Sequence, residues 1–337
     1  MLVRLSGRLL SLLQLTRMAL VFTAIADSGC GLLLRVRAGG KTGEQVLPSL
    51  DWRQVLCIAA ISVGLYGFGM SLNDIIDHRR DRQLASHRPL PSGRVGMVGA
   101  HVVSILLVML ALSAAVYYML LAPRGWMSLI LVIGAVLLIC FYDFAGKYLV
   151  APGLLTLGLI RFCHAAIPAP TTPLIWHPLL LLNHIVILSA VAYRWEQKRP
   201  ALTGRHWLLV LGGLGLIDLA VIALATWQRW RGGLTFDQAL WITPGLWMPI
   251  LAAGGFVLLA TWIRLRGGSG RSAGQQVMLY GLLWLIIYDA SFALGYIGWK
   301  AAAFILLLAP VAWLSVQLIR WWSSLALLTR TPTFKRA

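Results

Sequence analysis

The sequence predicts an all-α protein that crosses a membrane many times, and three observations support this prediction. Of its 337 residues, 59% are hydrophobic and only 12% are charged, against about 25% charged residues in average proteins. The mean hydropathy is +0.79. Apolar stretches long enough to span a bilayer recur along the whole chain between short polar connectors. We therefore predict a single integral-membrane domain over residues 1–337, built as a polytopic helical bundle.

The apolar stretches predict nine transmembrane helices, and a tenth that the sequence does not clearly separate from the ninth. The predicted spans are residues 14–34, 54–76, 96–121, 126–143, 149–169, 178–195, 206–227, 245–264, 277–296 and 300–320. Residues 277–320 fit either one long span or two short ones. Arg17 and Arg161 fall inside predicted spans, where a charged side chain is costly and usually faces a polar interior or a partner.

The net charge is +18, and the basic residues are distributed as the predicted membrane topology requires. If the N-terminus is cytoplasmic and the spans alternate, 19 of the 29 Lys and Arg residues fall on the cytoplasmic side and eight on the other. Such an excess in cytoplasmic loops is the usual orientation signal of membrane proteins. We therefore predict no nucleic-acid partner, and we predict that the loops after the second, fourth and sixth spans share the cytoplasmic face.

Cysteines and isolated polar residues inside the spans give weaker signals. The four cysteines are Cys30, Cys57, Cys140 and Cys163. They form no Cys-x-x-Cys pair, so we interpret them as packing residues and predict neither a disulfide nor a zinc site. Asp289 stands alone in an apolar stretch, where it either lines a cavity or pairs with a neighbouring helix. His164 follows Arg161 by three positions and shares its helical face.

An aspartate-rich stretch follows the second predicted span, where residues 73–93 read NDIIDHRRDRQLASHRPLPSG. Asp74, Asp77 and Asp81 recur at steps of three and four, which places them on one stripe of a helix. Carboxylates so close together repel unless a cation neutralises them, and their oxygens suit Mg²⁺. Four arginines accompany them: Arg79, Arg80, Arg82 and Arg88. The pattern predicts a metal-assisted diphosphate site; the alternative is a solvated loop of mixed charge.

The segments NDIIDHRRD and HRPLPSGR resemble the first aspartate-rich motif of the UbiA superfamily of intramembrane prenyltransferases. The resemblance implies Mg²⁺-dependent transfer of a prenyl group from a polyprenyl diphosphate to an aromatic or lipid acceptor within the membrane. It implies that Asn73, Asp74 and Asp77 bind the metal and that Asp81 completes its shell. It also implies an integral membrane protein of a bacterial inner membrane, with its active-site loops in the cytoplasm.

Further residues enter the expected site through the same resemblance. Arg17 matches the arginine that opens the family's first helix, and together with Arg88 and Lys147 it would neutralise the leaving diphosphate. Tyr142 and Lys147, in YDFAGK, correspond to the family's Tyr-x-x-x-Lys element, with one extra residue between them. Tyr142 or Phe144 would face the allylic cation.

The family's second aspartate motif, expected at the end of the sixth span, is absent from this sequence. Residues 192–206 read AYRWEQKRPALTGRH, with Glu196 as the only acid. Glu196 would hold a single metal ion, or Arg194 would replace the second ion as a fixed positive charge; the alternative is an ordinary basic loop. In the segment GLIRFCH, Arg161 is either a pocket residue or a structural partner of a carbonyl or an acid. These departures resemble a divergent UbiA-like branch, the ebo-type proteins of small bacterial gene clusters.

Two other functions are weighed against prenyl transfer. A non-catalytic UbiA-like protein that binds or transports lipid diphosphates is favoured by the missing second motif and opposed by the intact first one. An alcohol phosphatidyltransferase would carry an Asp-Gly-x-x-Ala-Arg opening, which this sequence lacks.

Overall fold

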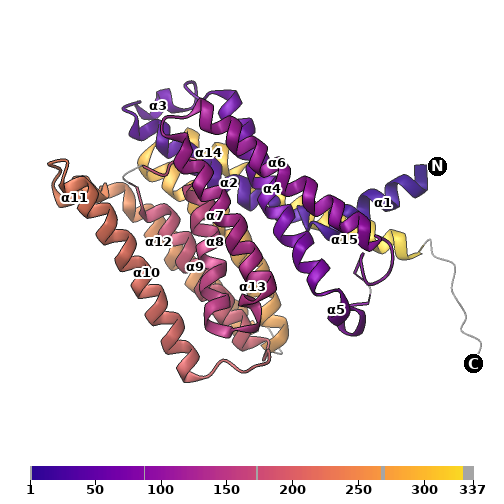
Figure 1. Ribbon diagram of the computed structural model, residues 1–337. Coiled ribbons are helices and arrows are strands. Elements are labelled where there is room, and N and C mark those ends of the chain that lie inside the picture. Colours follow the sequence, from indigo (N-terminus) through magenta and orange to yellow (C-terminus); the bar gives the residue numbers. More distant parts are fainter. Residues whose placement is uncertain (1, 87, 172–173, 267–269, 329–337) are drawn as a thin grey trace, which may run out of the picture.

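The computed structural model describes residues 2–86, 88–171, 174–266 and 270–328, and α-helices dominate these ranges without any strand (Figure 1). The helices are α1 (Leu2–Leu15), α2 (Val21–Ala38), α3 (Gly43–Val46), α4 (Trp52–Ile76), α5 (His78–Leu84), α6 (Met97–Leu121), α7 (Gly125–Phe144), α8 (Val150–Ala166), α9 (Trp176–Trp195), α10 (Gly204–Trp230), α11 (Phe236–Leu240), α12 (Trp247–Arg266), α13 (Gly270–Tyr296), α14 (Trp299–Leu306) and α15 (Leu308–Leu328). Three 3₁₀ turns join them: η1 (Met18–Leu20), η2 (Gly146–Tyr148) and η3 (Pro244–Leu246).

Eight stretches of helix in the described ranges are long and apolar enough to cross a membrane. They comprise α4, α6, α7, α9, α10, α12 with η3, α13, and α14 with α15. The apolar α8 is shorter, and α2 carries three charged residues, yet both run through the bundle beside the others. The all-α transmembrane prediction is therefore confirmed. Residues 277–320 belong to two candidate spans, α13 and then α14 with α15, and Gly298, at a φ of 136°, lies in the turn between them.

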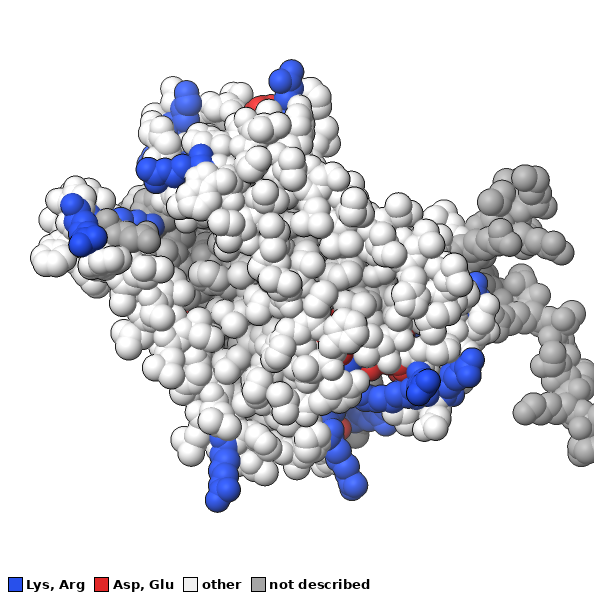
Figure 2. Space-filling view, viewed as in Figure 1, with Lys and Arg blue, Asp and Glu red and all other residues white. Residues whose placement is uncertain are grey.

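The outer helices expose apolar side chains, as lipid-facing helices do. Leu106 on α6, Leu137 on α7, Leu216 on α10 and Leu258 on α12 are all exposed. Figure 2 shows Lys and Arg side chains near opposite ends of the molecule, with a broad band of uncharged residues between them. This distribution matches a bundle whose apolar belt contacts hydrocarbon while its charged ends reach water.

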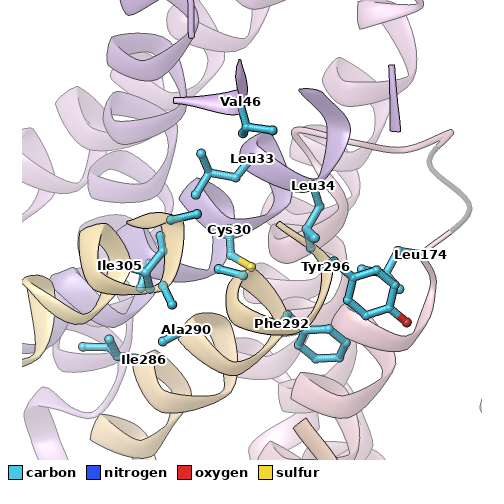
Figure 3. Close-up of a cluster of buried hydrophobic side chains, with 14 of the residues drawn as sticks. Cys30, Leu33, Leu34, Val46, Leu174, Ile286, Ala290, Phe292, Tyr296 and Ile305 are labelled. Atoms are coloured by element: carbon cyan, nitrogen blue, oxygen red, sulfur yellow. The ribbon is translucent and has the colours of Figure 1, made fainter. Parts of the chain in front are cut away.

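Helix α2 lies inside the bundle and contacts α4, α8 and α13. Around it, α4 packs on α6 and α7, α7 packs on α8, α8 on α9, and α9 on α13. Apolar side chains of α2, α13 and α14 form one buried cluster, which includes Leu33, Phe292 and Ile305 (Figure 3). Arg17, just before α2, contacts Asp74, and Asn73 contacts Asp143, so the start of α2, the end of α4 and the end of α7 lie near one another and build the candidate site.

The predicted first span, residues 14–34, is wrong at its beginning. Helix α1 ends at Leu15, and Arg17 adopts a left-handed backbone conformation with φ 47° and ψ 36° before α2 begins at Val21. A right-handed helix cannot continue through such a residue. Arg17 therefore lies at a helix junction instead of inside a span, and from there its side chain reaches the aspartate motif.

Candidate active site

The aspartate motif occupies the end of α4 and the whole of α5. The backbone N–H of Asp77 donates to the Asn73 carbonyl over 2.9 Å, and the N–H of Asp81 donates to the Asp77 carbonyl over 2.8 Å. Helical hydrogen bonding thus continues across the junction between the two helices, and the spacing predicted from the sequence is kept. Figure 2 shows acidic side chains beside basic ones in this part of the molecule.

Arg88 joins Asp74 and Asp81 into one carboxylate pair. Its Nη1 lies 2.5 Å from Asp81 Oδ2 and 3.7 Å from Asp74 Oδ1, and both carboxylates are buried. Arg17 adds a second guanidinium, with Nη2 3.4 Å from Asp74 Oδ1. The turn that follows is closed by Gly93 at a φ of 73°, a conformation that favours glycine. Arg17, Arg88, Asp74 and Asp81 thus form one cluster of alternating charge.

Lys147 joins Asp77 and Asp143 into a second carboxylate pair. Its Nζ, on the turn η2, lies 2.7 Å from Asp77 Oδ1 and 4.0 Å from Asp143 Oδ1. The Asn73 amide donates to Asp143 Oδ1 over 2.7 Å. Asn73 is therefore grouped with Asp77 and Asp143, whereas the next residue along α4, Asp74, belongs to the pair around Arg88.

Asp143 was not singled out by the sequence analysis, although the sequence carries a signal for it. It stands at the end of the apolar helix α7, where an acid is costly, and it precedes Lys147 by four positions. It lies in the same YDFAGK segment that pointed to Tyr142 and Lys147. The family element specifies only the tyrosine and the lysine, so it does not predict the acid between them.

The two aromatic residues of this segment lie in different surroundings. Tyr142 is half-buried, and its hydroxyl lies within electrostatic range of Asp77, Asp143 and Arg17. Phe144, in contrast, is 64% exposed on the outside of the bundle. Of the two alternatives, Tyr142 is the residue that lies next to the acids, because Phe144, two positions further on, lies on the opposite side of α7.

Arg161 is held by an ion pair inside the bundle. Its Nε pairs with the fully buried carboxylate of Asp27 on α2, and its Nη2 donates to the Thr23 carbonyl over 3.0 Å. From the sequence, Arg161 is interpreted either as a pocket residue or as the partner of a carbonyl or an acid. The structure shows it paired with both a carbonyl and an acid. Asp27 itself was missed by the sequence analysis, because its partner follows 134 positions later and no local spacing connects them.

The loop after α9 carries no second carboxylate pair. Glu196 Oε2 lies 3.0 Å from Lys198 Nζ, and Arg194 is exposed. Within the described residues, no ion pair or hydrogen bond joins either of them to the aspartate motif. Tyr193, at the end of α9, nevertheless lies within electrostatic range of Arg80 on α5.

Comparisons with known proteins agree with this fold. The family model of the UbiA prenyltransferase family matches residues 46–275. A solved digeranylgeranylglyceryl phosphate synthase is 17% identical and covers 86% of this chain and 99% of its own, with a TM-score of 0.56. The apo structure of a UbiA homologue from Aeropyrum pernix K1 is 18% identical and covers 82% of this chain and 96% of its own, with a TM-score of 0.52. None of the curated proteins matches the sequence.

Because the family model covers more than half of the chain, the protein belongs to the UbiA prenyltransferase family. Together with its apolar helices, this membership makes it an integral membrane protein. The two structural matches, both below 20% identity, establish the shared fold.

Proposed function

We propose that this protein transfers a prenyl group from a polyprenyl diphosphate to an acceptor within the membrane, with Mg²⁺ as its cofactor. One observation carries the proposal: two carboxylate pairs lie side by side, each with a basic side chain between its members, and three of the four acids (Asp74, Asp81 and Asp143) are buried. Asp74 and Asp81 flank Arg88, and Asp77 and Asp143 flank Lys147. Family membership supports the same reaction class.

The donor set of both pairs fits Mg²⁺. Each pair offers hard carboxylate oxygens, and Mg²⁺ is commonly held by one or two carboxylates together with substrate phosphates. Asp74 and Asp81 would hold one ion, and Asp77 with Asp143 and the amide oxygen of Asn73 would hold a second. When bound, Mg²⁺ neutralises the diphosphate and favours its departure.

The basic residues of the site then act on the diphosphate. Arg88 and Lys147 occupy the positions between carboxylates that a metal ion would take, so a bound metal frees both for the diphosphate oxygens. Arg17, which is 42% exposed, is already open to a ligand. As the bond from the allylic carbon to oxygen breaks, negative charge grows on the leaving group, and these fixed cations stabilise it. The acceptor then bonds to the allylic carbon and releases a proton.

Three residues around the metal and diphosphate site have further proposed roles. Tyr142 presents its ring beside the acids, where it would shield the allylic cation from water. Asp143 takes the part that the family's second aspartate motif plays, because Glu196 is already paired with Lys198 and lies outside the cluster. Arg161 acts as a positioning residue that fixes α2 against α8.

The acceptor class and the orientation belong to the same proposal. We propose an aromatic or lipid alcohol acceptor that reaches the site from the bilayer. The excess of Lys and Arg in the loops on the side of the aspartate motif supports a cytoplasmic site. A bacterial inner membrane and kinship with the ebo-type branch remain predictions from the sequence resemblance.

The test is prenyl-diphosphate turnover by the purified full chain in nanodiscs. Radiolabelled diphosphates of ten to twenty carbons are supplied with Mg²⁺ and a lipid extract, and diphosphate release is measured. The comparison is between the wild type, Asp74→Asn and Asp237→Asn, the last being an exposed aspartate on α11 that serves as a matched control. Release that requires Mg²⁺, disappears in Asp74→Asn and persists in Asp237→Asn is the expected result.

The second candidate function, a non-catalytic binder of lipid diphosphates, gives a different result in the same assay. The absence of an acidic motif near Glu196 favours it. Binding of the labelled diphosphates without release, and without hydrolysis to free prenol, across the whole series would replace the transferase proposal by the binder.

A further inference from the structure

Three helices bring a cysteine, a histidine and an aspartate together inside the bundle, away from the aspartate motif. They are Cys30 on α2, His177 on α9 and Asp289 on α13, and each is at most 1% exposed. One potential ligand atom from each lies within 4.8 Å of the other two. Figure 3 shows the Cys30 sulfur facing the part of α13 that carries Ala290 and Phe292.

The hydrogen bonds of this group leave its charge incompletely compensated. His177 Nε2 lies 2.7 Å from Asp289 Oδ1, and the Cys30 thiol donates to the Asp289 backbone carbonyl over 3.3 Å. Asp289 Oδ2 has no hydrogen-bond partner although it is buried. A buried carboxylate oxygen without a partner is rare and costly, and it indicates an ion, a proton or a water molecule at that position.

The neighbouring Asp27 adds a second buried carboxylate. It lies within interaction range of Asp289, and its Oδ1 has no hydrogen-bond donor, whereas its Oδ2 faces Arg161 Nε. Arg161 pairs with Asp27 and balances its charge. No permanently charged side chain among the described residues pairs with Asp289, so its charge is balanced by a cation or by a proton shared with Asp27.

We propose that Cys30, His177 and Asp289 bind a divalent cation of the zinc type. Thiolate sulfur, imidazole nitrogen and carboxylate oxygen are the three ligand classes that Zn²⁺ takes in proteins. A thiolate and a carboxylate together carry two negative charges, so a divalent ion makes the site neutral, which a low-dielectric interior requires. A water molecule as fourth ligand would donate to the open oxygen of Asp27.

The site is separate from the proposed catalytic metals. It shares no residue with the aspartate motif, and it would cross-link α2, α9 and α13, which the chain otherwise joins only by packing and hydrogen bonds. An access route exists, because His177, Gly31 and Ala165 line a cavity of about 570 Å³. Its ligands come from three distant helices, which is why the cysteine spacing alone predicted no zinc site.

Cobalt serves as the probe, because a cobalt–thiolate bond gives a charge-transfer absorption that a cobalt–carboxylate site lacks. The full chain is purified in nanodiscs, its metal content is measured by mass spectrometry, and chelator-stripped protein is titrated with Co²⁺. We expect about one zinc or cobalt per chain at this site and a thiolate charge-transfer band. A wild type that binds no such ion and shows no band overturns the proposal.

Variants identify the ligands. Cys30→Ser and His177→Ala should lose the band, whereas Asp74→Asn should keep it, which separates this site from the proposed Mg²⁺ site. A triple variant, in which Cys57, Cys140 and Cys163 are all replaced by serine, leaves Cys30 untouched and should keep the band in full. Loss of the band in the triple variant contradicts the proposal even if Cys30→Ser fails to fold.

Discussion

Lys147 Nζ lies 2.7 Å from Asp77 Oδ1, and this contact fastens the turn after α7 to the aspartate motif. The side chains are only 8% and 14% exposed, respectively, so water screens their attraction weakly. Removal of one partner from such a pair leaves an uncompensated charge, which is more costly than the loss of the attraction itself. The contact therefore stabilises the fold, and both of its residues belong to the proposed catalytic site.

Replacement of Lys147 by methionine should therefore destabilise the protein. We expect the free energy of unfolding to fall by about 3 kcal/mol, because Asp77 and Asp143 then face each other without a cation. Thermal unfolding in detergent with a chelator present measures the effect. The double variant Lys147→Met/Asp77→Asn should recover most of the loss, and addition of Mg²⁺ should partly rescue the single variant. An unchanged unfolding midpoint in Lys147→Met would show that the ion pair does not contribute to stability.

Asp143→Asn tests whether this residue supports a metal in place of the missing second motif. We expect diphosphate release to fall about 10- to 100-fold at low Mg²⁺ and to recover partly at high Mg²⁺, since one charged oxygen ligand is lost. The measurement is the Mg²⁺ dependence of release. Asp218→Asn is the matched control, because Asp218 is another helical aspartate, hydrogen-bonded to the Asn183 amide over 3.0 Å. Equal Mg²⁺ dependence in both variants would remove Asp143 from the site.

Arg161→Gln separates a positioning role from substrate binding. Because Asp27 is fully buried, we expect this change to lower the free energy of unfolding by about 3–5 kcal/mol. The double variant Arg161→Gln/Asp27→Asn should regain stability, and its KM for the prenyl diphosphate should equal that of the wild type. A raised KM in the stable double variant would instead make Arg161 a substrate ligand.

The part of the site that the sequence predicts well is the part held by local spacing. Asp74, Asp77 and Asp81 follow the helical repeat, and Arg88 lies seven residues further on, so contacts along one helix and its adjoining turn decide their positions. The membrane topology is predicted for a similar reason, because hydropathy reports directly on each span.

The contacts that the sequence does not predict connect distant helices. Asp143 is 70 positions from Asn73, and Asp27 is paired across the bundle with Arg161, so both partnerships depend on helix packing. The position of Arg17 depends on a single left-handed backbone conformation that hydropathy does not report, because mainly apolar stretches lie on both sides of it. Phe144 illustrates the same limit, since a shift of two residues around a helix separates it from Tyr142 and moves it to the exposed surface.

The close packing of α4 on α6 depends on Gly64, and this gives a final prediction. A Cβ atom at Gly64 would lie 2.6 Å from the Leu107 carbonyl oxygen, whereas one at Gly134, in the middle of α7, would meet nothing within 4 Å. Gly64→Ala should therefore force the helices apart and cost about 1–3 kcal/mol of unfolding free energy. Gly134→Ala should stabilise its helix by about 0.5–1 kcal/mol, because alanine is the better helix former. Since α4 carries the aspartate motif at its end, Gly64→Ala should also weaken diphosphate binding, and equal unfolding midpoints for the two variants would refute this account of the α4–α6 contact.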